Sequence, residues 1–166
     1  MANLPIRKTA RGIVFDPSGR VLLLRVSGGL TDIAVQDSAD GFWITPGGRI
    51  EGHEDARAAI KRELTEETGI DAKIGRELFM GVHQLIWGGV NTILFERYFE
   101  VHTLEVNAHF DGMESDERTV TRGWRWWTVE ELVQTRAVIF PRQLGPFLVR
   151  LRNHEYPDLP IELDIA

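Results

Sequence analysis

The chain has 166 residues, the length of one ordinary domain, and 43% of them are hydrophobic, which is enough to close a sizeable core. It contains no cysteine, which excludes disulfides, zinc–thiolate sites and cysteine nucleophiles. A formal net charge of −6 argues against a nucleic-acid binder that neutralises many phosphates, and no apolar run reaches membrane-spanning length. The lack of cysteine fits a reducing compartment, so we expect a cytoplasmic protein.

The predicted elements begin with a β-hairpin. Residues 8–15 end in an apolar run, residues 21–26 are almost all aliphatic, and the tetrapeptide between them contains the proline and glycine of a tight turn. Polar residues 27–41 predict a long loop, and residues 42–45 a short strand that Pro46 and two glycines end. Strong helix formers then predict a helix over residues 54–68, capped by Gly69.

The second half continues the alternation of strands and helices. Aromatic and aliphatic residues predict a second hairpin over residues 77–85 and 90–101, followed by a strand over residues 123–128. Thr128 and Glu131 form a capping-box pattern that predicts a helix to about residue 136. Pro141 opens a last helix to about residue 153, and the tail from residue 156 carries two prolines and is expected to be irregular.

These elements predict an α+β or mixed α/β class, because the strands build hairpins and the helices are interspersed among them. No internal repeat or linker marks a second domain. We therefore expect one domain over residues 1–153, followed by a C-terminal tail, residues 154–166, of unknown role.

The chemistry is concentrated in the helix over residues 54–68. Glu63, Glu66 and Glu67 are spaced i, i+3 and i+4, so they share about 100° of one helix face. Crowded carboxylates repel one another, and a divalent cation relieves that repulsion. Oxygen ligands of this kind select Mg²⁺ or Mn²⁺. Such a pattern alone is usually a solvated acidic face, yet here Gly48 precedes it, where a backbone carbonyl can approach a cation.

The spacing of this segment resembles the signature of the Nudix hydrolase family. That signature asks for Gly, five residues, Glu, seven residues, Arg-Glu, an aliphatic residue, one residue, Glu-Glu, one residue, Gly and an aliphatic residue. Every spacing is matched by Gly48, Glu54, Arg62-Glu63-Leu64, Glu66-Glu67 and Gly69-Ile70. A chance match has a probability of roughly 10⁻⁷ at average residue frequencies. The resemblance extends over about residues 8–147.

The resemblance implies a Nudix-type α/β/α sandwich around a mixed β-sheet. It also implies a metal-dependent pyrophosphohydrolase that cleaves the phosphoanhydride bond of a nucleoside diphosphate linked to another moiety, such as a nucleotide, a sugar or a second nucleoside. Two or three Mg²⁺ or Mn²⁺ ions would be bound by Glu63, Glu66 and Glu67 with the carbonyl of Gly48, and Arg62 would support the cluster. The general base would be Glu63, with the loop residues Glu117 or Glu114 as alternatives.

Four further side chains are candidates for substrate contacts. Trp43 and Trp87 offer aromatic faces for a nucleobase, although large aromatics in strands, such as Trp126 and Trp127, more often belong to the core. Arg25 and Arg97 lie in otherwise apolar strands, where an unpaired charge is costly. We expect each of these two arginines to have a carboxylate partner. The alternative is that it faces the phosphates of the substrate.

Several alternatives remain at this point. A ligand-binding protein of the same fold without catalysis is disfavoured because all the signature carboxylates are present. A hydrolase of a non-nucleotide diphosphate is also possible. Processing of RNA 5′ ends is disfavoured by the negative net charge, so we expect a small-molecule substrate, no nucleic acid and no membrane. Members of the family are often dimers, which makes a homodimer one expectation.

Overall fold

The computed structural model describes residues 4–27, 41–87, 89–109, 111–113, 120–156 and 158–165. Within these ranges, no helix is long and apolar enough to cross a membrane. The elements follow in the order β1 (Ile6–Phe15), β2 (Val21–Val26), β3 (Phe42–Ile44), β4 (Gly47–Arg49), α1 (Ala56–Thr68), β5 (Ile74–Trp87), β6 (Val90–His102), β7 (Thr121–Trp127), α3 (Val129–Gln134), β8 (Ile139–Phe140), α4 (Leu144–Arg152) and β9 (Ile161–Glu162).

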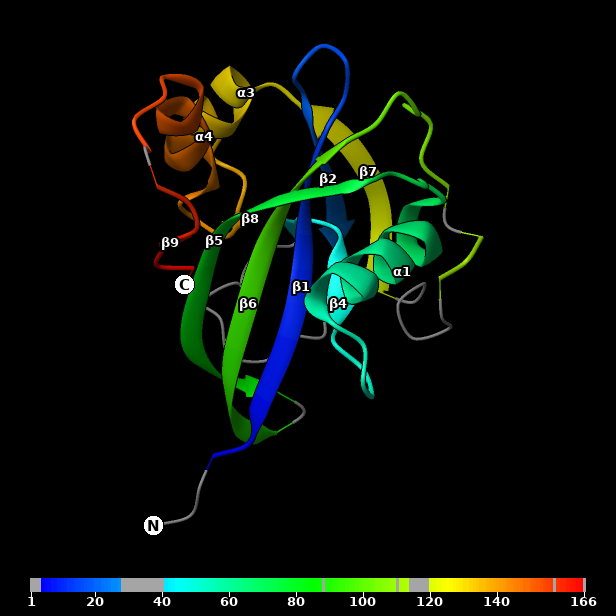
Figure 1. Cartoon of the computed structure of the whole chain (residues 1–166), viewed down its shortest axis with the longest axis vertical. Coiled ribbons are helices and arrows are strands. Elements are labelled where there is room, and N and C mark those ends of the chain that lie inside the picture. The colour runs from blue at the N-terminus through cyan, green and yellow to red at the C-terminus, as the bar shows by residue number, and fades with distance from the viewer. Residues whose placement is uncertain are drawn as a thin grey trace.

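The strands form one curled mixed sheet with the order β8-β3-β2-β1-β6-β5-β9 (Figure 1). Strand β4 also pairs with β1, and β7 also pairs with β2. The β1–β6, β3–β8 and β5–β9 pairs are parallel, whereas the two predicted hairpins, β1–β2 and β5–β6, are antiparallel. The expected α+β class with a mixed sheet is therefore confirmed.

Local hydrogen bonds explain where the main elements turn, begin and end. In the β1–β2 turn, the buried Asp16 carboxylate accepts the backbone N–H groups of Ser18 and Arg20 at 2.9 and 2.8 Å. Helix α1 begins two residues later than expected, because Asp55 is the N-cap and accepts two N–H groups of the first turn. It ends at Gly69, which has a left-handed φ of 71° and donates to the carbonyl of Thr65, as a C-cap glycine does.

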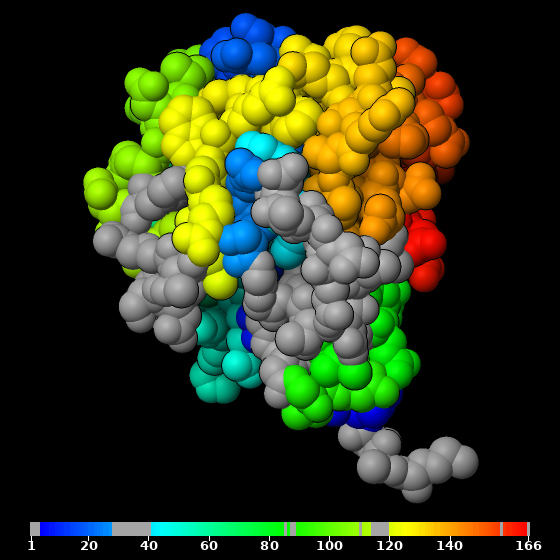
Figure 2. Space-filling model, turned by 180° about the vertical axis from the view of Figure 1, so that it is seen from behind, coloured from blue at the N-terminus to red at the C-terminus, as the bar shows by residue number. Residues whose placement is uncertain are grey.

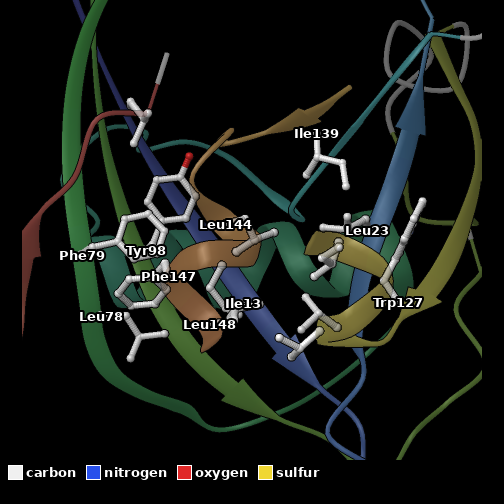
Figure 3. Packing of buried hydrophobic residues seen from close by; sticks show 14 residues of the cluster. Ile13, Leu23, Leu78, Phe79, Tyr98, Trp127, Ile139, Leu144, Phe147 and Leu148 are labelled. Atoms are coloured by element: carbon white, nitrogen blue, oxygen red, sulfur yellow. The ribbon is translucent and has the colours of Figure 1, made fainter. Parts of the chain in front are cut away.

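The two faces of the sheet are covered by different helices. On one face, Ala59 and Ile60 of α1 pack against Ala10 and Phe99. On the opposite face, the core combines residues of β1, β5 and β6 with α3 and α4, and Phe147 of α4 meets Phe79 at 4.6 Å between ring centroids (Figure 3). The predicted core positions Trp126 and Trp127 are both buried.

Two sequence expectations about irregular segments are wrong in part. Gly47 and Gly48, expected only to end a strand, lie in β4, because their backbone pairs with Arg11 and Ala10 of β1. The tail, expected to be irregular, contains β9, which pairs in parallel with β5 and leads to the buried Ile165. Seen from behind, the C-terminal segment (red) lies between α4 (orange) and β5 (green) on one flank of the molecule (Figure 2).

Candidate active site

The acidic face of α1 lies against β4, and the absence of a side chain at Gly48 makes room for it. Glu63 and Glu67 are only 5% and 7% exposed, although both are carboxylic acids. A Cβ atom on Gly48 would lie 2.5 Å from the carboxyl carbon of Glu63 and 2.6 Å from its Oε2. The Glu63 carboxylate therefore occupies the space directly beside the backbone of Gly48, which explains the glycine at this position.

Gly47 holds the second buried carboxylate. Its N–H group donates to Oε2 of Glu67 at 2.6 Å, a short charge-assisted hydrogen bond. Its φ of +131° is one that side chains rarely adopt, and a Cβ there would lie 2.8 Å from the Cα of Arg11. Glycine is thus required at residue 47 by the backbone, and this conformation aims its N–H group at Glu67.

Arg62 is the internal cation of the cluster. Its Nη1 atom donates to Oε1 of Glu63 at 3.1 Å and to Oε2 of Glu66 at 3.0 Å, while Nη2 donates to Oε1 of Glu54 at 2.8 Å. These bonds to Glu54, together with the nearby carboxylates, outweigh partial burial and raise the pKa of Arg62. The same hydrogen bonds lower the pKa of Glu54. Arg62 therefore steadies three carboxylates at once, and Glu54 holds it from the loop before α1.

The donor set of this cluster suits a hard divalent cation. Within the described ranges, no group of three or more histidine or carboxylate side chains is arranged to hold a metal ion. The chemistry of the residues nevertheless fits one, because Glu63, Glu66 and Glu67 share one face of α1 and the Glu63 carboxylate lies directly beside the Gly48 backbone. All of these donors are oxygen atoms, the ligands that Mg²⁺ and Mn²⁺ prefer.

A buried ion pair behind β4 was not predicted from the sequence. Arg11 of β1 donates from Nε to Oε1 of Glu96 at 2.9 Å, and from Nη1 to the carbonyl oxygen of Gly47 at 2.6 Å. Thr9 and Tyr98 donate their hydroxyl groups to the same Glu96 carboxylate at 2.9 and 2.7 Å. The sequence carried no specific signal for this pair, because each of the two strands contains several charged residues.

The candidate substrate contacts are only partly brought to this site. Arg97 forms a bidentate ion pair with Glu77, so the partner interpretation of this residue is the one that the structure supports. Arg25 of β2 lies opposite Trp43 of β3 in the sheet. The Trp43 ring packs edge-on against the core residue Trp127, with 5.2 Å between the ring centroids, and so contacts the core.

Three predicted site residues fall wholly or in their side chains outside the described part of the chain. Glu117 and Glu114 lie outside the described residues, and so does the side chain of Trp87 at the end of β5. The described segment before these two glutamates does reach α1, since a Cβ on Gly112 would lie 2.8 Å from the carbonyl oxygen of Glu66.

Comparisons with known proteins agree with this architecture. The family model described as the NUDIX domain matches residues 5–148. A protein of Gluconacetobacter diazotrophicus named RNA pyrophosphohydrolase is 30% identical over 166 aligned residues, covering 90% of this chain and 92% of the relative.

Two solved structures share the fold. The solution structure of the E. coli ORF135 protein has a TM-score of 0.64 at 24% identity and covers 93% of this chain and 96% of that one. The NUDIX domain of Shewanella oneidensis NrtR, complexed with ADP ribose, has a TM-score of 0.60 at 14% identity and covers 93% and 90% of the two chains. Because both identities are below 25%, these two structures show a shared fold and nothing more. The second structure also shows that a protein of this fold can bind ADP ribose.

Proposed function

The chain belongs to the Nudix family, and from this membership we propose that it is a Nudix pyrophosphohydrolase that depends on Mg²⁺ or Mn²⁺. Its substrate would be a nucleoside diphosphate linked to another moiety, cleaved at the phosphoanhydride bond. One observation carries the proposal. The buried carboxylates Glu63 and Glu67, with Glu66 on the same helix face, lie against the glycine strand β4, where the Glu63 carboxylate is directly beside the backbone of Gly48.

The protein's own residues support each requirement of this reaction. Glu63, Glu66, Glu67 and the carbonyl of Gly48 would hold two or three ions, which supply a water of lowered pKa and neutralise the diphosphate oxygens. Arg62 keeps Glu63 and Glu66 in place through Nη1. This arrangement also addresses the repulsion between an anionic substrate and a chain with a net charge of −6.

The general base is proposed to be Glu63, which would accept the proton of the attacking water at a carboxylate oxygen. Its place in the cluster supports this role, because Arg62 donates to its Oε1 at 3.1 Å and orients the carboxylate beside Gly48. Glu117 and Glu114 remain the alternatives. Support for them comes from Gly112, which lies against the backbone of Glu66 only a few residues before them.

A second candidate substrate is the 5′ end of RNA. The specific observation in its favour is the relative named RNA pyrophosphohydrolase, which this chain matches over 90% of its length. The net charge of −6 argues against extensive contacts along a nucleic acid, so the RNA would be gripped mainly by its terminal phosphates. The expectation that no nucleic acid is bound therefore stays a prediction. Homodimerisation, a cytoplasmic location and a domain confined to residues 1–153 also stay predictions.

The test is a Mg²⁺- and Mn²⁺-dependent hydrolysis screen over nucleotides, nucleotide sugars, dinucleoside polyphosphates and a 5′-triphosphorylated RNA oligonucleotide. Glu67→Gln serves as the inactive variant. Glu130→Gln on the exposed surface of α3 is the matched control, because it removes a carboxylate of the same kind away from α1. Turnover that is present in the control and absent in Glu67→Gln supports the proposal and names the substrate class. Absence of turnover over the whole panel with both metals would contradict it.

A further inference from the structure

Both backbone polar groups of Gly47 in β4 are hydrogen-bonded to charged side chains. On one side its N–H donates to Glu67 of α1 at 2.6 Å. On the other side its carbonyl oxygen accepts Nη1 of Arg11 at 2.6 Å. The carbonyl of Thr45, two residues earlier, accepts the same Nη1 at 3.3 Å. Arg11 therefore fixes the strand that carries both the Glu67 donor and the carbonyl of Gly48.

Arg11 is itself fixed by a buried carboxylate. Glu96 is 5% exposed and accepts Nε of Arg11 at 2.9 Å, and Thr9 and Tyr98 complete its hydrogen bonding. Burial alone would lower the pKa of Arg11 and raise that of Glu96. The attraction between the two groups outweighs burial, so the pKa of Arg11 is raised and that of Glu96 is lowered. Both groups therefore stay charged at neutral pH, and the guanidinium has one defined orientation.

We infer that Arg11 is a positioning residue for the acidic cluster: held by Glu96, it fixes the Gly47–Gly48 backbone and through it the place of Glu67. The inference rests on the proposed function, in that the positioned groups are those assigned to the metal. It adds a residue 52 positions before Glu63, outside the segment that carries the chemistry. The planar fork of Arg11 donates to the carboxylate from Nε and to the two carbonyl groups from Nη1, and the single nitrogen of a lysine has no such fork.

The experiment compares Arg11→Lys with the wild type in metal-free protein and in Mn²⁺ titrations. Lysine keeps the charge beside Glu96 but has a single ammonium that cannot reach Glu96, Thr45 and Gly47 together. We expect Mn²⁺ binding, measured by calorimetry or by the free-ion electron paramagnetic resonance signal, to weaken about 10- to 100-fold. In the metal-free protein, the amide of Gly47 should exchange with solvent at least about tenfold faster, because its hydrogen bond to Glu67 loses alignment.

Three further variants separate positioning from a general loss of stability. Tyr98→Phe removes a donor to Glu96 but leaves every bond of Arg11, so Mn²⁺ affinity should stay within about twofold of wild type. Leu148→Ala opens a cavity in the α4 layer and should lower the melting temperature without changing Mn²⁺ affinity. If Arg11→Lys does not fold, the double variant Arg11→Met with Glu96→Gln removes the buried charges together and is measured in its place.

The possible outcomes distinguish this inference from the proposed function. Wild-type Mn²⁺ affinity and Gly47 exchange in Arg11→Lys would overturn the positioning role while leaving the metal site intact. A wild-type protein that binds no Mn²⁺ would overturn the metal assignment. In that case faster Gly47 exchange in Arg11→Lys would still show that Arg11 fixes β4. An equal loss of affinity in Leu148→Ala would also count against the inference, because it would show that stability alone governs binding.

Discussion

Gly48→Ala should damage catalysis with little effect on folding. A Cβ at this position would lie 2.5 Å from the carboxyl carbon of Glu63, whereas ordinary van der Waals contact begins near 3.4 Å. The carboxylate must therefore move by about 0.9 Å, the difference between these distances. Gly48 has no left-handed φ, so the backbone accepts alanine, and the displaced group is the end of a flexible side chain. The expected cost in the free energy of unfolding is about 1 kcal/mol or less.

The catalytic cost should be much larger, because Mg²⁺ tolerates little deviation from octahedral geometry. A misplacement of about 1 Å in an active site can cost about 100-fold in rate. We therefore expect kcat for the best substrate of the screen to fall about 100-fold in Gly48→Ala, while the melting temperature falls by only a few degrees.

The matched control is Gly19→Ala in the β1–β2 turn. Gly19 has a φ of +77°, so alanine is strained there, but among the described residues no atom beyond its chain neighbours lies within 4 Å of the new Cβ. This variant should lose stability and keep its kcat. Near-wild-type kcat in Gly48→Ala would refute the assignment of Glu63, and a comparable loss in Gly19→Ala would show that stability governs the rate.

Three further predictions follow from the same structure. Glu66→Gln and Glu67→Gln should each lower kcat by orders of magnitude with a melting temperature close to wild type, and near-normal turnover in both would contradict the site. Ile165 is 1% exposed, so Ile165→Ala should lower the free energy of unfolding, measured in urea, by about 2–4 kcal/mol. A loss below about 1 kcal/mol would show that the tail is not part of the core. Burial by itself would raise the pKa of Glu96. The charge of Arg11 and three hydrogen bonds have the larger effect, so the pKa lies below its ordinary value of 4.5. The stability that this ionised group contributes is therefore fully present above pH 4.5 and is lost as the pH falls through the lower pKa of the folded state. Glu96→Gln should therefore lose less free energy of unfolding on acidification than the wild type does. An equal loss in the two proteins would contradict the lowered pKa.

The candidate site was largely predictable because its chemistry is local in sequence. Glu63, Glu66 and Glu67 fall within five residues, and helix periodicity alone places them on one face. The family resemblance added Arg62, which reaches Glu66 one turn later in the helix. Strand and helix positions followed from apolar runs and caps, as at Thr128, whose capping box with Glu131 is present in the structure.

What the sequence could not supply were contacts between distant strands. Arg11 and Glu96 are 85 residues apart, and only the parallel pairing of β1 with β6 brings their side chains together. Arg97 left two interpretations open because its partner Glu77 lies 20 residues away on β5. The tail appeared irregular because its two-residue strand depends on the free edge of β5. An isolated pair of residues has no periodicity from which a strand can be inferred.

The two adjacent glycines show how one sequence feature can have two physical causes. Both are typical of a turn, yet both lie in β4, and a side chain would be excluded at each for a different reason. At Gly47 the obstacle is the backbone of β1, together with the positive φ, so this glycine serves the fold. At Gly48 the obstacle is the Glu63 carboxylate itself, so this glycine serves the chemistry. Arg11 and Glu67 form hydrogen bonds to the carbonyl and the N–H group of Gly47. Gly47 therefore also fixes the position of the adjacent Gly48, whose backbone lies beside the Glu63 carboxylate.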